Sequence, residues 1–444
     1  MTQLFGKKVW RVIYWANWIL IIGFWWSNSN SLFGGGWPSL MIAFGRLAGL
    51  MAAYMILLQF FFMGRTPYLE RVFGLDKLSQ IHHSNGLRGF YFLVLHPIFL
   101  ILGYRVLKEQ SIWSQIKDFF LNYEYVNFAI IGFLFFVVIV ASSIYISRKR
   151  LRYESWYFVH LLAYLAVFGS FWHQISLGED LLVSAVFYWY WIGLYTFVFA
   201  NHLAFRFARL VYKFFKHQFF VERVVRENYN TISVYIGGRN LDKFNIHAGQ
   251  FMIFRFLAKG FWWQAHPFSL SILPDGKKLR ITIKNVGDFT AKAQEIKEGT
   301  KVFIDGPYGV FTDLFGVSEK VLMIAGGIGI TPIRSLMERL LSKGKDVTLL
   351  YSARTEKDIV FKREIDEVAK KYGGKVVYVV SDEPNFSGEK GRLDQEKIKA
   401  LVPDLNTREV FLCGPPPMME AVILSLKNLD TSISRIHFEK FSMG

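Results

Sequence analysis

Six long apolar runs fill the first half of the chain and limit what it can fold into. They cover roughly residues 12–26, 40–63, 82–103, 125–146, 155–174 and 181–205. A helix rises about 1.5 Å per residue, so about 20 residues cross the hydrocarbon of a bilayer, and most of the runs reach that length. The first run is shorter, but no small-residue cleavage site follows it, so we interpret it as a retained helix. The runs predict a six-helix transmembrane bundle over residues 1–210.

Basic side chains lie mostly on one side of this predicted bundle. Fourteen Lys and Arg residues flank the ends of the runs on one side, and three flank the ends on the other. Because cytoplasmic loops are enriched in Lys and Arg, we predict a multi-pass cell-membrane protein with both termini, and everything after residue 210, in the cytoplasm. This orientation explains the net charge of +17, so we expect no nucleic-acid partner. The single cysteine excludes a disulfide scaffold and a Cys-ligated zinc or iron–sulfur site.

Histidines lie inside two of the runs, where ionisable side chains are costly and each needs a reason. The third run carries His82 and His96, and the fifth carries His160 and His173. These two runs cross in the same direction, so the four side chains form two cross-helix pairs at two depths. Two stacked bis-histidine haems require such pairs. The alternative is that the four are hydrogen-bonded helix-packing residues.

The two histidine spacings differ in how well they suit a straight helix. Fourteen residues at about 100° per residue bring His96 back to within about 40° of the face of His82. Thirteen residues leave about 140° between His160 and His173. We therefore expect the fifth span to tilt, or to unwind locally near Gly169.

Four further ionisable residues lie in or near the runs. His83 is turned about 100° from its neighbour, so we expect it to face elsewhere, and we expect His202 at the membrane interface. Arg46 and Arg88 lie within spans, where a buried cation needs an anion. Haem propionates would supply one, and Arg46 could also attract an anionic acceptor. The alternative is that each guanidinium snorkels to the interface.

Short strand-like segments follow one another between about residues 217 and 310: FFVERVV, NTISVYIG, GQFMIFRFL, KLRITIKNV and KVFIDGPYG. Several short strands at regular spacing predict a small antiparallel barrel. Between them, His266-Pro267-Phe268-Ser269-Leu270-Ser271 combines a stiff backbone, an aromatic face and hydroxyl donors, which suits a flat ring with polar edges. Gly287 and Thr290 open a predicted helix, whose hydroxyl-capped start is an anion site.

A strand–turn–helix pattern begins near residue 318. An apolar strand ends in the turn Gly326-Gly327-Ile328-Gly329, and Thr331 and Pro332 suit the cap and first position of the next helix. Glycines there let a pyrophosphate approach the backbone at the helix start. Ser352 and Arg354 end the next strand, where a hydroxyl and a guanidinium suit a ribose 2′-phosphate. A last strand leads into Cys413-Gly414-Pro415, and ligands of open α/β sheets bind at such strand ends.

In combination these features resemble the NADPH oxidase and ferric reductase family of transmembrane flavocytochromes, above all its bacterial members. The resemblance covers nearly the whole chain. The spacings His82/His96 and His160/His173 match the haem ligands of the family, and HPFSLS at 266–271 is similar to its flavin motif. AGGIGITP at 325–332, YSAR at 351–354 and LCGPPPMM at 412–419 are similar to its nicotinamide-dinucleotide motifs.

The resemblance implies a bis-haem transmembrane domain over residues 1–210 and a cytoplasmic ferredoxin-reductase-like module. That module would comprise a β-barrel FAD domain, 211–315, and an α/β NADPH domain, 316–444. The implied cofactors are two b-type haems, FAD and NADPH. The residues implied to bind FAD and NADPH are His266, Pro267, Phe268, Ser269, Ser271, Lys284, Gly287, Thr290, Gly326, Gly327, Gly329, Thr331, Pro332, Ser352, Arg354, Cys413, Gly414, Pro415 and Phe441.

The resemblance also implies that electrons pass from NADPH through FAD and the haems to an acceptor at the outer face. We expect the acceptor to be O2, giving superoxide, and a ferric chelate is the alternative. A proton channel, or a membrane interaction subunit with a degenerate reductase tail, is the alternative from another class. Two positions depart from the family. Met443 stands where members commonly end in an aromatic, with Phe441 two residues earlier, and Leu100 stands where oxygen-reducing eukaryotic relatives have a further histidine.

Overall fold

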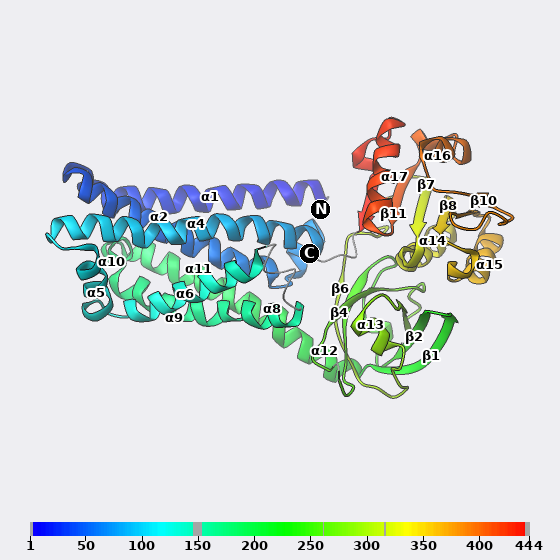
Figure 1. Cartoon of the computed structure of the whole chain (residues 1–444), viewed down its shortest axis with the longest axis horizontal. Coiled ribbons are helices and arrows are strands. Elements are labelled where there is room, and N and C mark those ends of the chain that lie inside the picture. The colour runs from blue at the N-terminus through cyan, green and yellow to red at the C-terminus, as the bar shows by residue number, and fades with distance from the viewer. Residues whose placement is uncertain (1–2, 145–152, 261, 315–316, 440–444) are drawn as a thin grey trace. The chain divides into compact units, whose positions relative to one another are not determined.

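The computed structural model describes the chain except for residues 1–2, 145–152, 261, 315–316 and 440–444, and two compact units make up the described part (Figure 1). The first unit comprises Gln3–Leu69 and Lys77–Arg206. The second comprises Glu70–Asp76 and Phe207–Gly444. The break at residue 206 falls close to the end of the predicted transmembrane half.

The first unit is helical, and its long helices run side by side in Figure 1. In the apolar 18-residue stretch of α2, half of the residues are buried, against 6% in the corresponding stretch of α4. Helix α2 is therefore the more enclosed of these two helices. Large apolar side chains such as Trp189 and Phe168 are exposed, as expected of surfaces that face lipid. The helices are α1 (Gln3–Ser29), α2 (Gly36–Met63), α3 (Pro67–Phe73), α4 (Leu75–Leu107), α5 (Ile112–Asn122), α6 (Val126–Ser143), α8 (Tyr153–His160), α9 (Leu162–Leu177), α10 (Glu179–Val183) and α11 (Ala185–His202).

Four helical stretches of the described residues are long and apolar enough to cross a membrane. They match the second to fifth predicted runs. The first and last runs form α1 and α11, which lie outside that set and are rich in Trp and Tyr. The prediction of six spans is therefore confirmed for four helices, and the full count stays a prediction. The four stretches are Gly36–Met63, Leu75–Leu107, Val126–Ser143 and Ser155–Leu177.

The second unit begins with a small barrel, as the alternating segments predicted. Two three-stranded antiparallel sheets, in the orders β1-β2-β5 and β4-β3-β6, face each other across one apolar core. Isolated bridges from Phe220 to Lys301 and from Leu270 to Ile281 connect the two sheets. The strands are β1 (Phe220–Asn228), β2 (Thr231–Gly237), β3 (Phe251–Phe256), β4 (His266–Ser269), β5 (Leu279–Lys284) and β6 (Val302–Tyr308), with helix α13 (Asp288–Ala293) after β5.

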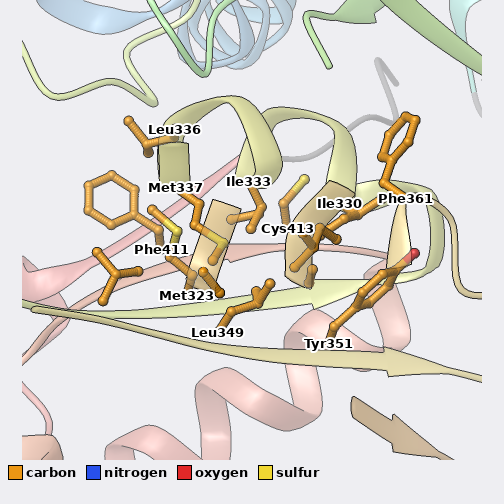
Figure 2. Close-up of a cluster of buried hydrophobic side chains, with 14 of the residues drawn as sticks. Met323, Ile330, Ile333, Leu336, Met337, Leu349, Tyr351, Phe361, Phe411 and Cys413 are labelled. Atoms are coloured by element: carbon orange, nitrogen blue, oxygen red, sulfur yellow. The ribbon is translucent and has the colours of Figure 1, made fainter. Parts of the chain in front are cut away.

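A six-stranded parallel sheet of order β10-β9-β8-β7-β11-β12 completes the second unit. Helices cover both of its faces, so its strands carry near-continuous apolar residues. Figure 2 shows α14 residues such as Ile333 and Met337 packed on Met323 and Leu349 of the strands. The elements are β7 (Lys320–Gly326), α14 (Ile330–Ser342), β8 (Asp346–Ala353), α15 (Lys362–Tyr372), β9 (Lys375–Val380), β10 (Glu389–Lys390), α16 (Gln395–Leu401), β11 (Glu409–Cys413), α17 (Pro416–Asn428) and β12 (Ile436–Glu439).

A short amphipathic helix, α12 (Arg209–His217), packs on the barrel. The ring of Phe214 stacks on Phe303 of β6 with centroids 3.9 Å apart and planes at 9°. Beside it, the ammonium of Lys213 donates to the carbonyl of Gly306. Burial, and to a lesser extent the nearby Arg209, lowers the pKa of Lys213 to about 7. The α12 helix is therefore held to the barrel by both stacking and a buried polar contact.

Candidate functional site

Four histidines of the first unit face one another in two pairs. The rings of His82 and His160 have centroids 5.9 Å apart, and those of His96 and His173 are 6.5 Å apart. Helix α4 supplies one member of each pair, and α8 and α9 supply the others. The pairing and the two levels that the sequence predicted are both present in the structure.

The separation of the rings suits a metal-centred group. An imidazole nitrogen binds a metal at about 2 Å, so two rings on opposite sides of one metal ion have centroids roughly 6 Å apart. Both measured separations agree with this value. Among the described residues, no hydrogen bond engages Nε2 of any of the four rings, and Nδ1 of His82, His160 and His173 is buried without one. The helix-packing alternative requires such bonds, and only the Nδ1 of His96 has one, to the carbonyl of Gly45 at 2.8 Å.

Glycines on α2 make room for the outer pair. A Cβ atom on Gly49 would lie 2.6 Å from Nδ1 of His96, closer than any real contact. A Cβ atom on Gly45 would lie 2.8 Å from Cδ2 of Leu100, the residue one turn beyond His96. Leu100 therefore packs against α2, at the position where oxygen-reducing eukaryotic members of the family that the sequence resembles have a further histidine.

The change of helix phase in the fifth span occurs at Leu161, not near Gly169 as we expected. Helix α8 ends at His160 and α9 begins at Leu162. The amide of Tyr164 bonds the carbonyl of Leu161, a tighter i to i+3 contact that alters the phase between the two histidines. Gly169 instead allows α6 to approach, since its Cβ would lie 3.1 Å from the carbonyl oxygen of Phe128.

The two remaining histidines of the runs differ in exposure. His83 is exposed, as expected. His202 is buried, with Nδ1 2.9 Å from the carbonyl of Phe60 and Nε2 2.8 Å from the hydroxyl of Tyr164. Its polar atoms are satisfied inside the bundle, and its depth relative to the membrane interface stays a prediction.

The two arginines differ in their surroundings. Arg46 is paired with the carboxylate of Glu179; its side chain is only 16% exposed, so the anion that a buried cation needs is present in the chain itself. Arg88 is exposed on α4. Sequence reasoning missed Glu179 because it follows the fifth run by only a few residues and carries no pattern of its own.

In the second unit, the flavin-like motif forms β4 and places its groups on one side of the barrel. The ring of His266 stacks on Phe289 of α13, with centroids 3.7 Å apart. Ser269 is 3% exposed, and its hydroxyl is buried without a hydrogen-bond partner. A buried donor of this kind fits a ring with polar edges. Thr290 accepts from the amide of Gly287 at 2.9 Å, which confirms the predicted helix start.

Ser271 of the motif and Lys284 at the end of β5 are both engaged within the protein. The hydroxyl of Ser271 contacts Oγ1 of Thr282 at 2.8 Å. The ammonium of Lys284 lies 3.5 Å from Oδ1 of Asp358, in the segment after β8. Lys284 therefore connects the barrel to the parallel sheet, which the sequence did not indicate.

The glycine-rich turns after β7 and β11 form one patch at the carboxyl edge of the sheet. A Cβ on Gly329 would lie 2.3 Å from the carbonyl oxygen of Cys413, and one on Gly414 would lie 3.1 Å from Cα of Gly326. These glycines are required by the close approach of the two turns. Gly327 has a positive φ of 51°, which suits glycine. Backbone amides at such an edge can bind a phosphate.

Three further predictions for this edge have different outcomes. Thr331 does not cap α14: the cap is Gly329, and the Thr331 hydroxyl donates to the carbonyl of Ile328 at 3.1 Å. Pro332 accordingly lies inside the first turn.

Ser352 is in register with Gly326, and Arg354 is exposed just beyond β8, so both lie at the expected edge. Phe441 lies outside the described residues.

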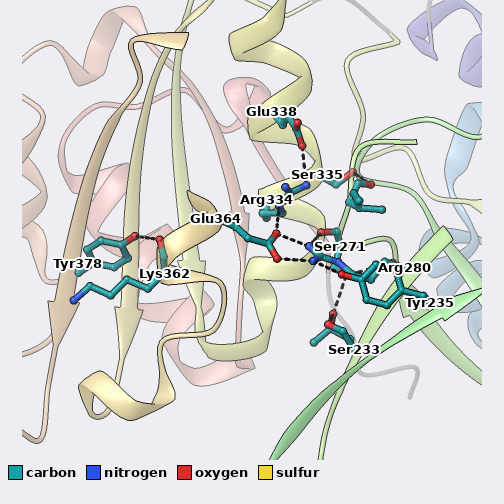
Figure 3. A network of polar contacts seen from close by, with 12 residues as sticks. Ser233, Tyr235, Ser271, Arg280, Arg334, Ser335, Glu338, Lys362, Glu364 and Tyr378 are labelled. Atoms are coloured by element: carbon teal, nitrogen blue, oxygen red, sulfur yellow. Dashed lines mark hydrogen bonds and ion pairs between the residues drawn. The ribbon is translucent and has the colours of Figure 1, made fainter. Parts of the chain in front are cut away.

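A buried polar network connects the barrel to the sheet (Figure 3). Arg280 of β5, 1% exposed, donates to both oxygens of Glu364 at 2.7 and 2.9 Å. Arg334 of α14 contacts the same carboxylate at 3.2 Å and Glu338 at 2.7 Å. The guanidinium of Arg280 also lies 4.4 Å from the ring centroid of Phe361. This network orients the barrel and the sheet relative to each other.

Comparisons with protein families match three segments of the chain. Residues 48–171 match the ferric reductase like transmembrane component, 218–312 an FAD-binding domain, and 323–423 the oxidoreductase NAD-binding domain. The first contains His82, His96 and His160 and ends two residues before His173. The second contains β4 and α13, and the third contains the glycine-rich patch.

Similar individual proteins match part of the chain. The reductase subunit of glycine betaine monooxygenase from Chromohalobacter salexigens is 33% identical over 186 residues, which are 39% of this chain and 48% of that protein. NADH-cytochrome b5 reductase 2 from Mycosarcoma maydis is 34% identical over 144 residues, 31% of this chain and 41% of that protein. The chain thus spans less than half the length of these relatives. A solved structure of the ferredoxin reductase in carbazole 1,9a-dioxygenase is 27% identical, with a TM-score of 0.45, over 51% of this chain and 69% of that one.

Proposed function

The chain is an oxidoreductase with the domain architecture of the NADPH oxidase and ferric reductase family, and from this premise we propose that it transfers electrons across the cell membrane. The donor is cytoplasmic NADPH, and the electrons pass through FAD and two b-type haems to an acceptor at the outer face. The observation that carries this proposal is the pair of facing imidazoles at each of two levels.

His82 and His160 would hold the inner haem, and His96 and His173 the outer one. The flavin would convert a two-electron donor into one-electron steps, and the haems would relay single electrons through hydrocarbon. The work of the chain at these positions is placement and exclusion of water. Helix α2 supports the outer level, since Gly45 holds His96 and Gly49 leaves space for its ring.

The second unit would bind the donor at its strand ends. The amides of the Gly326–Gly329 turn suit the pyrophosphate, and Arg354 suits the 2′-phosphate of NADPH. The buried hydroxyl of Ser269 and the ring of Phe289 suit the flavin. The intact condition of these sites argues against a proton channel or interaction subunit with a degenerate reductase tail.

Two observations favour O2 over a ferric chelate as the acceptor. Arg46, which adjoins Gly45 on α2, is already neutralised by Glu179, so it does not offer an uncompensated positive charge to an anionic chelate. Among the residues that the structure describes, no group of three or more His, Cys, Asp or Glu side chains is placed to bind a metal ion. A small neutral acceptor needs neither feature.

The test measures NADPH-driven reduction by the purified full chain, with and without superoxide dismutase and against ferric chelates. We expect split b-type absorption bands that bleach with NADPH, and a reduction of a superoxide indicator that the dismutase suppresses. A chelate reduced faster than the indicator, with no effect of dismutase, would establish the ferric alternative. Absence of b-type bands would contradict both.

A further inference from the structure

Helix α12 packs on the barrel with one face and exposes aromatic side chains on another. The ring of Phe214 stacks on Phe303 of β6. Phe215 and Tyr212 lie about 100° and 160° around the helix from Phe214, and they are 69% and 61% exposed. The uncovered face of a helix on a globular protein is normally polar, so these two exposed rings require an explanation.

Exposed apolar side chains continue onto the barrel next to α12. Lys301 precedes Phe303 by two residues, so the two side chains are on the same face of this segment. Lys301 forms a bridge with Phe220, and its carbonyl accepts the amide of Leu257 at 2.9 Å. Directly opposed residues of antiparallel strands point to the same face of a sheet, and Phe220 and Leu257 are both exposed. The outward face that carries α12 is therefore apolar beyond the helix itself.

The connection between β3 and β4 adds two tryptophans at the same end of the barrel. Trp262 and Trp263 are 60% and 37% exposed. Trp263 lies three residues before His266, which is in register with Phe254 of β3, and Leu257 lies three residues after Phe254. Three residues span at most about 11 Å, so the tryptophans and Leu257 belong to one region. We call the following six side chains the apolar patch: Tyr212, Phe215, Phe220, Leu257, Trp262 and Trp263.

Basic side chains accompany the apolar patch. Lys216 lies on α12, Lys259 lies in the β3–β4 connection, and Lys301 is bridged to Phe220. Lys259 and Lys301 are exposed. The margin also holds an acid, Glu222 beside Phe220, which offsets part of this positive charge. Trp and Tyr side by side with Lys are typical of protein surfaces at a membrane interface.

The chain brings α12 close to the membrane. Helix α11, the last predicted span, ends at His202, the π-helical segment Leu203–Ala208 follows it, and α12 begins at Arg209. The seven residues from His202 to Arg209 extend at most about 25 Å. A lipid surface is therefore within reach of a patch that begins on α12, and anionic lipids of the cytoplasmic leaflet attract basic residues next to a span.

We propose that the apolar patch is a docking surface for a lipid bilayer, through which the second unit binds an anionic leaflet. The aromatic side chains of α12 and of the β3–β4 connection lie among the headgroups, and Lys216, Lys259 and Lys301 face the lipid phosphates. Lipid thus covers an apolar surface that would be costly in water. The inference goes beyond the proposed function and requires only that the first unit lies in a membrane.

The test places nitroxide labels on the full chain in nanodiscs of phosphatidylcholine and phosphatidylglycerol. The labelled variants are Phe215→Cys and Trp262→Cys, and the control is Leu424→Cys, an apolar residue of α17 that is 60% exposed. Cys413 is buried, so the unsubstituted chain supplies the blank. Paramagnetic relaxation by O2, which concentrates in lipid, and by a water-soluble nickel chelate reports the surroundings of each label. We expect the labels at 215 and 262 to lose accessibility to nickel and gain accessibility to O2, whereas the label at 424 stays accessible to nickel.

Charge reversal tests the role of the basic residues. The triple variant Lys216→Glu/Lys259→Glu/Lys301→Glu, combined with each label, should restore accessibility to nickel at positions 215 and 262. The matched control, Lys370→Glu/Lys399→Glu/Lys427→Glu, makes the same change of charge at exposed positions on α15, α16 and α17 and should leave both labels shielded. Nanodiscs of phosphatidylcholine alone should resemble the first triple variant.

Two outcomes would overturn the docking surface. Labels at 215 and 262 that remain as accessible to nickel as the label at 424 would show that the patch faces water. Labels shielded from both reagents would show that protein, not lipid, covers it. If Trp262→Cys lowers the FAD content, Tyr212→Cys replaces it. The labels are read without NADPH, so a chain whose haem bands never bleach would overturn the proposed function and leave this test unchanged.

Discussion

Nδ1 of His96 lies 2.8 Å from the carbonyl oxygen of Gly45, and this contact connects α4 to α2. A carbonyl oxygen only accepts, so Nδ1 must carry the proton, and the lone pair of the ring is then on Nε2. A haem ligand requires that tautomer, and a hydrogen bond from the other nitrogen orients the ring. In the proposed outer site the ring of His96 is therefore oriented for a haem, in contrast to the rings of His82, His160 and His173, whose Nδ1 atoms are buried without a hydrogen bond.

Replacing His96 with Ala should remove one haem while the nucleotide end continues to work. We expect the haem content to fall from two to one per chain and transmembrane transfer to be lost. NADPH oxidation coupled to a soluble dye should remain within about twofold, because the second unit is untouched. Pyridine haemochrome assay and dye reduction measure the two effects. His83→Ala, an exposed neighbour of the inner ligand, is the control and should retain both haems; if His96→Ala also retains both, the outer assignment is wrong.

A side chain added at Gly49 should displace the ring of His96 while His96 itself is left unchanged. A Cβ there would lie 2.6 Å from Nδ1 of His96, so Gly49→Ala must shift the ring or the helix. We expect a lower content of the outer haem, or a changed absorption band, with the inner haem unchanged. Gly193→Ala is the control, because no atom lies within 4 Å of its Cβ position on α11. Identical spectra for the two variants would contradict the predicted role.

Arg354→Ala should raise the Michaelis constant for NADPH more than that for NADH. Loss of a charge-assisted contact to a 2′-phosphate costs about 1.5–3 kcal/mol, or roughly ten- to a hundredfold. Steady-state dye reduction with each nucleotide measures the ratio. Arg363→Ala, an arginine whose side chain is 92% exposed on α15, should change neither constant. Equal effects of Arg354→Ala on both nucleotides would remove the assigned role.

Glu364→Gln should destabilise the second unit. It would leave Arg280 and Arg334, which are 1% and 8% exposed, without their shared carboxylate. The side chain of Glu364 is 35% exposed and Arg334 keeps its contact with Glu338, so the loss costs less than that of a fully buried pair, roughly 2 kcal/mol, which lowers the melting temperature of a unit of this size by roughly 4–8 °C. Thermal release of flavin fluorescence reports the transition. Glu367→Gln, whose side chain is 64% exposed, should shift it by less than about 2 °C.

Stability should rise with pH above neutrality because of Lys213. Its pKa is lowered to about 7, whereas in the unfolded chain it has the ordinary value near 10. Between these values the unfolded state binds more protons than the folded state, so the free energy of unfolding increases with pH. The melting temperature of the wild type should therefore rise from pH 7 to pH 9 relative to Lys213→Met. If the melting temperatures of the two proteins changed with pH in parallel, Lys213 would be shown to stay charged in the folded protein.

Much of this architecture could be predicted from local patterns. The four paired histidines lie within two apolar runs, and the spacing of fourteen places His82 and His96 near one face of one helix. The barrel strands and the turn after β7 follow from alternation and from glycine. These signals are local, so neighbouring residues are sufficient to define them.

The remaining features depend on contacts between distant segments. Glu179 pairs with Arg46, and Glu364 with Arg280, across gaps of 133 and 84 residues, and a single acidic residue gives no sign of its partner. Thr331 was misplaced because the 3-10 turn at Gly327–Gly329 starts the helix before the hydroxyl. The partners of His202, the carbonyl of Phe60 and the hydroxyl of Tyr164, likewise come from distant segments.

The turn at Leu161 places His160 at the end of α8 and His173 within α9, whereas on α4 His82 and His96 lie on one continuous helix. If each pair holds a haem, as we propose, a small shift of α8 would change the surroundings of the inner level while α9 keeps the outer level fixed. The chain would then have a way to set the two midpoint potentials separately without rebuilding the bundle.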